Sequence, residues 1–76
     1  MTIDSTEFIQ FVAEIMEISP DALTLETKYG EVQQWDSIMQ LRLVMEIEAR
    51  YGVEIPIDKV AEINTLNKFF MLIKEK

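Results

Sequence analysis

Apolar side chains recur every three or four positions between residues 5 and 18, which places them on one face of an α-helix. This apolar face comprises Phe8, Phe11, Val12, Ile15 and Ile18, with Ile9 and Met16 at its flank. Asp4 or Ser5 can cap the helix start. Ser19-Pro20 stops the helix, because proline disfavours helical geometry in the residue before it. The pattern therefore predicts a first helix over residues 5–18.

A second helical pattern, over residues 37–51, is apolar around most of its circumference. Its apolar members are Ile38, Leu41, Leu43, Val44, Met45, Ile47, Ala49 and Tyr51. A helix with so wide an apolar arc is buried on several sides, so we expect it to form the centre of the fold. The exposed stripe that remains consists of Met39, Arg42, Glu46 and Arg50. Asp36 caps this helix, and Gly52 ends it.

Residues 19–35 lack helical periodicity, and we expect them to form a long loop. Pro20 can open a short helical turn within it, and Gly30 can supply a turn with positive φ. The apolar residues that pin this loop across the bundle are predicted to be Leu23, Leu25, Tyr29, Val32 and Trp35.

The C-terminal third contains two further helical patterns. Asp58 is the expected cap of a short helix that continues to Ile63, and Asn64 or Thr65 is the expected cap of a last helix over residues 65–75. The inward face of that last helix is predicted to hold Leu66, Phe69, Phe70, Leu72 and Ile73. The sequence thus predicts an all-α fold, a small four-helix bundle of three longer helices and one short one, with a long loop between the first and second helices.

Length and composition limit what this fold can bind. The 76 residues predict a single domain over residues 1–76, and without Cys or His the core has neither disulfides nor a zinc site to support it. Fourteen acidic and seven basic residues give a net charge of −7. This charge opposes binding to nucleic acid or anionic membranes and favours docking onto basic protein surfaces.

No apolar run approaches the roughly 20 residues that a membrane span requires. The N-terminus also lacks the basic flank and apolar stretch of a signal peptide. We therefore expect a cytoplasmic protein. Because a complete helical pattern follows Met1 directly, we also expect a free-standing one.

His and Cys, two residue types common in catalytic sites, are missing from this chain. A nucleophilic triad needs a general base, normally His, and there is none. Gly30 and Gly52 are too far apart to form a phosphate-binding glycine loop, and the acids match no calcium loop. We do not expect catalysis by this chain alone.

Ser37 is the candidate functional residue, since it opens the longest predicted helix directly after Asp36. Backbone N–H groups and the positive end of the helix dipole favour a phosphate ester at that position. An Asp-Ser pair is also common at ordinary helix starts, where the aspartate is simply a cap. A serine without a nearby base is a poor catalyst but a good attachment point for a group that another enzyme adds.

The region around Ser37 resembles the attachment region of acyl and peptidyl carrier proteins. The likeness starts at Trp35-Asp36-Ser37-Ile38, continues through residues 41–56, which end in Ile55-Pro56, and extends to Val60, Ile63 and Asn64-Thr65-Leu66. The remainder fits the first helix and long loop of that family. The resemblance implies a four-helix carrier that performs no catalysis of its own.

The resemblance also implies a cofactor and its site. A phosphopantetheinyl transferase would move 4′-phosphopantetheine from coenzyme A to Ser37, and the terminal thiol would hold an acyl or aminoacyl group as a thioester. Asp36 would help to present the serine and magnesium, while the transferase supplies the base. The family positions that line the bundle interior, where a tethered acyl chain can lie, are Ile38, Leu41, Met45, Ile55, Val60 and Ile63. Core packing is the first role of these residues.

The expected partners follow from a departure from the family. Members that serve fatty-acid synthesis carry several acids after the serine, whereas charges nearly cancel along the exposed stripe here. We therefore expect a carrier of a specialised biosynthetic pathway, loaded by its own adenylating ligase and served by a synthase or acyltransferase. The predicted partner contacts are Ile38, Met39, Arg42 and Glu46, with Met39 exposed beside the arm.

A carrier that visits several enzymes is expected to be a monomer. Two alternatives remain open from the residues alone. One is an acidic helical adaptor in which Ser37 is never modified, and the other is an enzyme that uses scattered carboxylates. A gain of one phosphopantetheine unit from coenzyme A, lost in Ser37→Ala, would distinguish the carrier from both.

Overall fold

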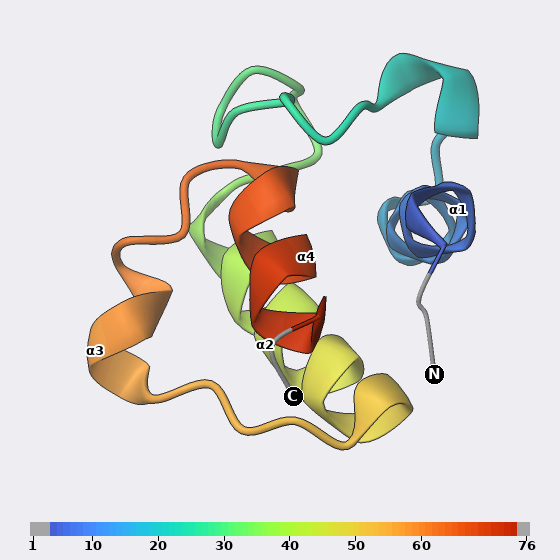
Figure 1. Cartoon of the computed structure of the whole chain (residues 1–76). Helices are drawn as coiled ribbons and strands as arrows, with labels where there is room; N and C mark the ends of the chain where they lie inside the picture. The colour runs from blue at the N-terminus through green and yellow to red at the C-terminus, as the bar shows by residue number, and fades with distance from the viewer. Residues whose placement is uncertain (1–3, 75–76) are drawn as a thin grey trace.

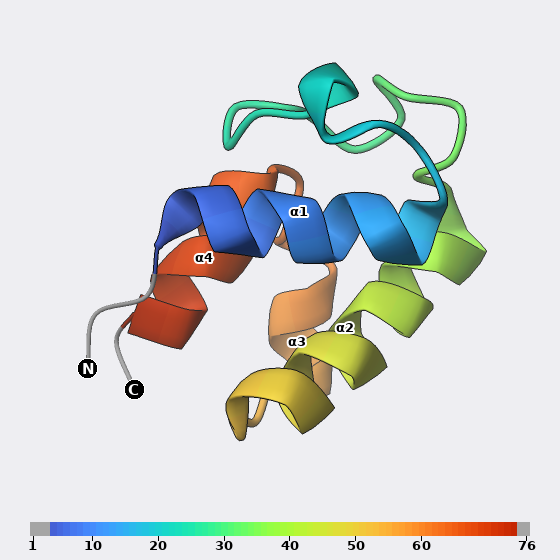
Figure 2. The same ribbon diagram turned by 90° about the vertical axis from the view of Figure 1, so that its right-hand side faces the viewer.

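A computed structural model describes residues 4–74, which form four α-helices and one short 3-10 helix (Figure 1). The elements in order are α1 (Ser5–Met16), η1 (Pro20–Ala22), α2 (Ser37–Tyr51), α3 (Ile57–Val60) and α4 (Leu66–Lys74). α1 and α3 lie on opposite sides of α2 and α4 (Figures 1 and 2). The described part of the chain contains no strand, so the prediction of an all-α four-helix bundle is confirmed.

Side-chain caps set the starts of α1, α2 and α4, and Asp36 is the cap of α2. An Asp4 carboxylate oxygen accepts a hydrogen bond from Thr6 N, and Thr65 Oγ1 accepts one from Lys68 N at 3.3 Å. α3 differs, because Pro56 occupies its cap position and makes no side-chain cap bond. The prediction that Asp58 caps this helix is therefore wrong. α3 begins one residue before Asp58 and ends at Val60 instead of Ile63.

α1 and α2 both end at a residue in the left-handed conformation, which is Glu17 for α1 and Gly52 for α2. α2 ends where predicted, with Gly52 at φ 65°. α1 ends at Met16, two residues earlier than predicted, because Glu17 adopts a left-handed φ of 59°. Ile18 N then donates to Ala13 O at 3.0 Å, which completes a Schellman turn. The predicted last residue of the final helix, Glu75, lies outside the described residues.

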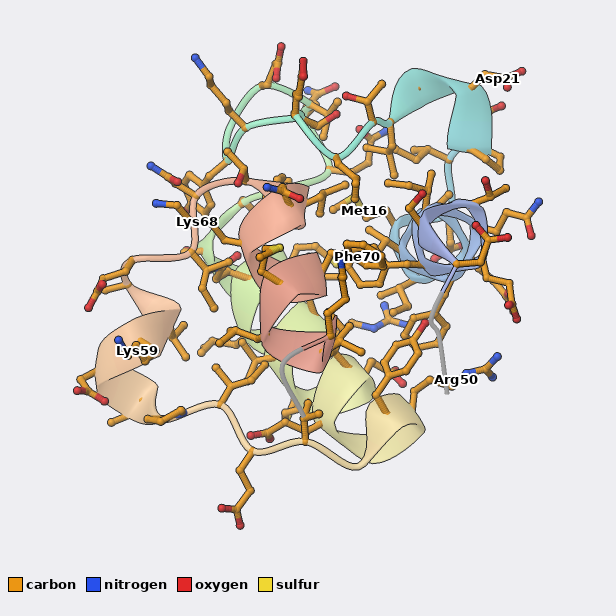
Figure 3. All side chains as sticks on the ribbon, viewed as in Figure 1. Met16, Asp21, Arg50, Lys59, Lys68 and Phe70 are labelled. Carbon is orange, nitrogen blue, oxygen red and sulfur yellow. The ribbon has the colours of Figure 1, made fainter. Side chains whose placement is uncertain are left out.

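The core is formed where α1, α2 and α4 meet. Phe8 from α1, Ile47 from α2 and Phe69 from α4 are all fully buried. The rings of Phe8 and Phe70 lie 5.5 Å apart, and Met16 and Phe70 point into the space between α1 and α4 (Figure 3). Burial of these large side chains supplies the main stabilisation of a chain that has no disulfides.

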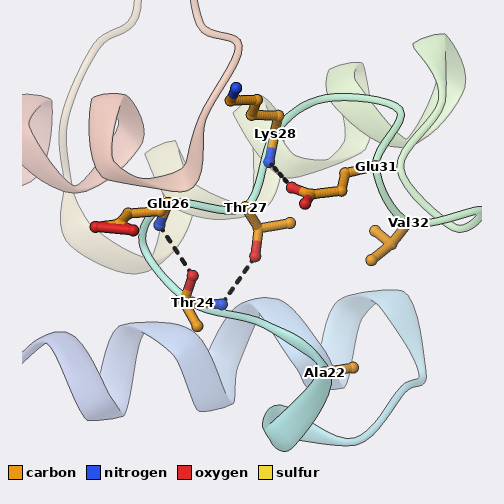
Figure 4. Close-up of a pocket in the computed structure, with 7 residues that line it drawn as sticks. All are labelled: Ala22, Thr24, Glu26, Thr27, Lys28, Glu31 and Val32. Carbon is orange, nitrogen blue, oxygen red and sulfur yellow. Dashed lines mark hydrogen bonds between the residues drawn. The ribbon is translucent and has the colours of Figure 1, made fainter.

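The long connection between α1 and α2 crosses the end of the bundle above the start of α4 (Figures 1 and 2). Its backbone is joined to that region, since Tyr29 N donates to Asn64 O at 2.8 Å and Asn67 N donates to Leu25 O at 2.8 Å. Within the loop, Thr24 N donates to the buried Thr27 hydroxyl at 2.8 Å (Figure 4). The loop therefore covers the end of the bundle and is held there by hydrogen bonds.

The predicted loop anchors are confirmed except for one. Leu23 and Trp35 are buried, and Leu25 and Val32 are partly buried against the core. Tyr29 is 43% exposed and only meets the edge of the Trp35 ring, at 5.9 Å between ring centres. Gly30 has the positive φ that the sequence predicted, at 81°.

α2 is buried on one side only, which corrects the prediction that it packs on several sides. Its buried residues, at helical spacing, are Gln40, Leu43, Val44 and Ile47. A second apolar row is exposed, and its members are Ile38 (78%), Leu41 (54%) and Met45 (64%). α3 has only four residues, so it is too short to cover this flank of α2. Met39, predicted to be exposed, is half-buried and packs against the core.

Candidate functional site at the start of helix α2

Ser37 is the first residue of α2, and it is exposed. The preceding Asp36 holds the start of the helix, because its Oδ1 accepts a hydrogen bond from Met39 N at 2.9 Å and its carbonyl accepts one from Gln40 N at 2.9 Å. The positive end of a 15-residue helix therefore lies at Ser37. This is a favourable place for a phosphate ester.

Two buried residues on either side of Ser37 anchor this turn to the core. The Trp35 side chain is 1% exposed, and its Nε1 donates a hydrogen bond to Gln40 Oε1 at 2.7 Å. The Gln40 amide nitrogen in turn donates to Val60 O at 3.0 Å and to Ile63 O at 2.9 Å. Ser37 is thus presented from a turn that is fixed from within the bundle.

A groove of about 470 Å³ runs beside Ser37 between α2 and α3. It is lined by Tyr29, Ser37, Gln40, Leu41, Ile57, Val60, Ala61, Ile63 and Asn64. Its walls are largely apolar and open to water, since Leu41 is 54% exposed and Ile57 is 83% exposed. A group attached to the Ser37 hydroxyl would have this groove directly beside it.

A second groove, of about 450 Å³, lies within the long loop and is lined by Thr24, Glu26, Thr27 and their neighbours (Figure 4). Several of its polar groups bond to one another. Glu26 N donates to Thr24 Oγ1 at 3.1 Å, and Lys28 N donates to Glu31 Oε1 at 2.8 Å. These bonds shape the loop, and Ser37 does not line this groove.

The residues that were predicted to line the bundle interior lie in three different places: in the groove, in the core and on the exposed side of α2. Leu41, Val60 and Ile63 do line the groove beside Ser37. Ile55 is buried, with its backbone N–H held by Glu48 Oε2 at 2.7 Å. The interior location predicted for Ile38, Leu41 and Met45 is wrong, because α3 leaves all three exposed.

Among the predicted partner contacts, Arg42 Nε and Glu46 Oε2 pair at 3.8 Å on the exposed side of α2. Ile38 is exposed beside them, whereas Met39 turns toward the core. The exposed side of α2 therefore includes Ile38 and not Met39.

Sequence reasoning missed five residues of the groove, which are Tyr29, Gln40, Ile57, Ala61 and Asn64. A signal was present for Gln40. It precedes Leu43, Val44 and Ile47 by three, four and seven positions, so it shares their helix face. Because glutamine is polar, Gln40 was not recognised as the first residue of the buried face of α2.

Residues 6–70 match the family described as "Phosphopantetheine attachment site". Similar proteins include the acyl carrier proteins of Rickettsia canadensis (strain McKiel) and Rickettsia typhi (strain ATCC VR-144 / Wilmington). Each is 32% identical over 68 residues, which cover 90% of this chain and 79% of the relative. The chain belongs to the acyl carrier protein family.

Acyl carrier proteins are carriers and not enzymes, and they hold 4′-phosphopantetheine covalently on a serine. This acyl carrier protein accordingly has a carrier role and interacts with a phosphopantetheinyl transferase and with pathway enzymes. Within residues 4–74, no helix is both long and apolar enough to cross a membrane. The same residues contain no group of three or more His, Cys, Asp or Glu side chains placed to hold a metal ion.

This acyl carrier protein has three serines on which the arm could be attached, and their settings differ. Ser5 precedes the region that matches the family and is half-buried in α1. Ser19 uses its hydroxyl oxygen to cap η1, accepting a hydrogen bond from Asp21 N at 3.3 Å. Ser37 combines exposure, a helix start and an adjoining groove, and so it is the serine that fits the group.

Proposed function

We propose that Ser37 carries the 4′-phosphopantetheine arm and that the protein shuttles an acyl or aminoacyl group between enzymes of a specialised biosynthetic pathway. When bound, the arm supplies a terminal thiol, which holds the cargo as a thioester. The observation that carries this proposal is the exposed hydroxyl of Ser37 at the positive end of α2. The family match over residues 6–70, which includes this serine, supports it.

The roles of the residues around Ser37 follow from their contacts. Ser37 Oγ would form the new bond to phosphorus as the bond between that phosphorus and the bridging oxygen of coenzyme A breaks, which releases adenosine 3′,5′-bisphosphate. Its proton passes to a base on the transferase, because this chain has no His to accept it. The Asp36 cap uses Oδ1, so Oδ2 can coordinate the magnesium ion that accompanies coenzyme A.

The charge distribution supports specialised partners. The first 36 residues contain eight acids and one base, so they carry the whole net charge of −7. Residues 37–76 contain six acids and six bases and are neutral. Attraction to a basic partner surface therefore acts on α1 and the long loop, and is weak around Ser37.

The exposed face of α2 supports recognition by apolar contact. Ile38, Arg42 and Glu46 follow one another at four-residue spacing, and Leu41 and Met45 form the adjacent row. An exposed apolar row on a small protein is a common mark of a protein-binding surface. We assign this face to the adenylating ligase and to the synthase or acyltransferase of the pathway.

Mass spectrometry tests the attachment site. Incubation with coenzyme A and a promiscuous phosphopantetheinyl transferase should add one phosphopantetheine unit to the wild-type protein and to Ser19→Ala, and none to Ser37→Ala. Addition to the Ser37→Ala variant would move the site to another serine. No addition to the wild-type protein would favour the unmodified adaptor.

Two further measurements test the pathway and the docking face. Met45→Asp should slow loading by the cognate ligase, because it places a charge in the apolar row, while Met71→Asp on α4 should not. Met71 is the matched control, since it is also an exposed methionine, at 43%. Elongation on this carrier by standard fatty-acid enzymes at the rate of their own carrier would refute the specialised pathway.

A further inference from the structure

We propose that Gln40 closes the floor of the groove beside Ser37 and keeps the tethered group out of the bundle core. The carrier is then suited to short or polar acyl groups and not to long aliphatic chains. This inference rests on the proposed function, because only an arm on Ser37 brings an acyl group to this groove.

Gln40 spans the base of the groove as a fixed polar bar. Its side chain starts on α2, and its amide nitrogen bonds to the carbonyls of Val60 and Ile63, which border the groove on the far side. Its amide oxygen is held by the Trp35 indole at 2.7 Å. The residue is only 7% exposed, although it lines the groove together with Ser37.

The hydrophobic core lies directly beyond this bar on the same face of α2. Leu43 and Ile47 follow Gln40 along that face, and each is fully buried. A chain that entered the core between α2 and the segment after α3 would have to displace the Gln40 amide. The indole N–H and the amide N–H groups would then be buried without partners, which strongly opposes entry.

The open side of the groove has the opposite character. Leu41 and Ile57 form exposed apolar walls, and the side chains of Tyr29 and Asn64 lie at its margin. A short acyl group can rest against these walls, and a polar one can keep its hydrogen bonds to water. A long chain gains little here, because apolar stabilisation requires removal of surface from water.

Chain length is the variable that tests this inference. Ser37 is loaded from acetyl-, hexanoyl- and dodecanoyl-coenzyme A by a promiscuous transferase, and loading is confirmed by mass. Because a group that binds only the folded state raises its stability, burial in the core would raise Tm with chain length, by about 10 °C once three methylenes are buried. We expect the wild-type Tm to stay within about 2 °C across the series.

The variant Gln40→Met removes the polar bar while keeping a similar side-chain size. We expect it to introduce a rise of Tm with chain length, whereas Gln33→Met, at an exposed loop glutamine, should leave the series flat. If Gln40 only stabilised the fold, Gln40→Met would lower the Tm of every acyl form equally, and Tm would still not depend on chain length. That result, or a slope in the wild-type protein, would overturn the inference.

Methyl NMR of the wild-type series decides the matter even if Gln40→Met does not fold. Signals of Leu41 and Ile57 should change with the acyl group, while those of Leu43 and Ile47 should not. Length-dependent changes at Leu43 and Ile47 would refute a closed floor. Absence of any mass gain on Ser37 would instead refute the proposed function, so the two failures are distinguishable.

Discussion

Loss of the hydrogen bond between Trp35 and Gln40 should destabilise the fold strongly, and the size of the effect can be worked out from the contacts. Trp35 is 1% exposed, so in Gln40→Leu its indole N–H loses its acceptor in a buried position. A buried donor left unpaired costs about 1–3 kcal/mol. Ile63 O also loses its amide partner, while Val60 O keeps the bond from Ile63 N at 3.2 Å.

The expected total for Gln40→Leu is about 2–4 kcal/mol in the free energy of unfolding. A chain of this length is expected to have about 4–11 kcal/mol in all, so the variant loses a large share of its stability. In a Trp35→Phe background the indole donor is already gone. Gln40→Leu should then cost about 1–2 kcal/mol less, which is the coupling energy between the two side chains.

Urea unfolding of the unmodified protein, followed by far-UV circular dichroism, measures all four members of this cycle. Circular dichroism is the suitable signal because the chain has one tryptophan, and Trp35→Phe removes its fluorescence. Gln33→Leu is the control and should change stability by no more than about 0.5 kcal/mol. A coupling energy below about 0.3 kcal/mol would show that the indole–amide bond does not hold the groove floor.

Three further changes have defined outcomes. Asp36→Ala should lower the free energy of unfolding by about 1 kcal/mol in urea, because the bond to Met39 N is lost, whereas Asp36→Asn should keep most of it. Both should slow phosphopantetheine transfer in timed mass spectrometry; normal rates would exclude magnesium coordination by Asp36. Glu17→Gly should raise stability by about 0.5–1 kcal/mol, since Glu17 lies at φ 59°; a loss in urea unfolding would contradict this. Burial raises the pKa of Tyr51, against the opposing charge of Arg50. The folded state therefore holds this proton more tightly, and stability should fall as the pH rises above about 10. Tyr51→Phe should remove that fall in urea midpoints measured against pH, and an unchanged alkaline profile would refute the assignment.

The sequence predicts best those elements whose ends carry local signals. The bounds of α2 agree with the prediction because Asp36 and Gly52 are a strong cap and a strong stop. The end of α1 was missed because a glutamate, Glu17, occupies the left-handed position that glycine or asparagine usually takes. The start of α3 was missed because Pro56 replaces the expected acidic cap.

Which faces of α2 are buried could not be predicted from the residues of α2 alone. A helical wheel assigns Ile38, Leu41 and Met45 to the interior, since it records hydrophobicity and not which neighbours exist. Their exposure depends on α3, whose single turn leaves that flank uncovered. Burial of Gln40 likewise depends on distant partners, with the Ile63 carbonyl 23 positions away along the chain. The exposure of Ser37 at a helix start was predictable because the Asp36 cap is a local signal.

The closed floor and the uncovered flank of α2 have a common consequence for recognition. With the cargo kept outside the core by Gln40, a partner enzyme can meet the acyl group without first extracting it from the bundle. In the proposed function, the exposed row at Ile38 and Met45 would let the same partner recognise the carrier itself, beside the arm. Exposed apolar surface promotes self-association, and the acidic α1 and long loop oppose this through mutual repulsion. The separation of charge from the region around Ser37 therefore lets one small chain expose an apolar row on α2 while its acidic N-terminal half opposes self-association.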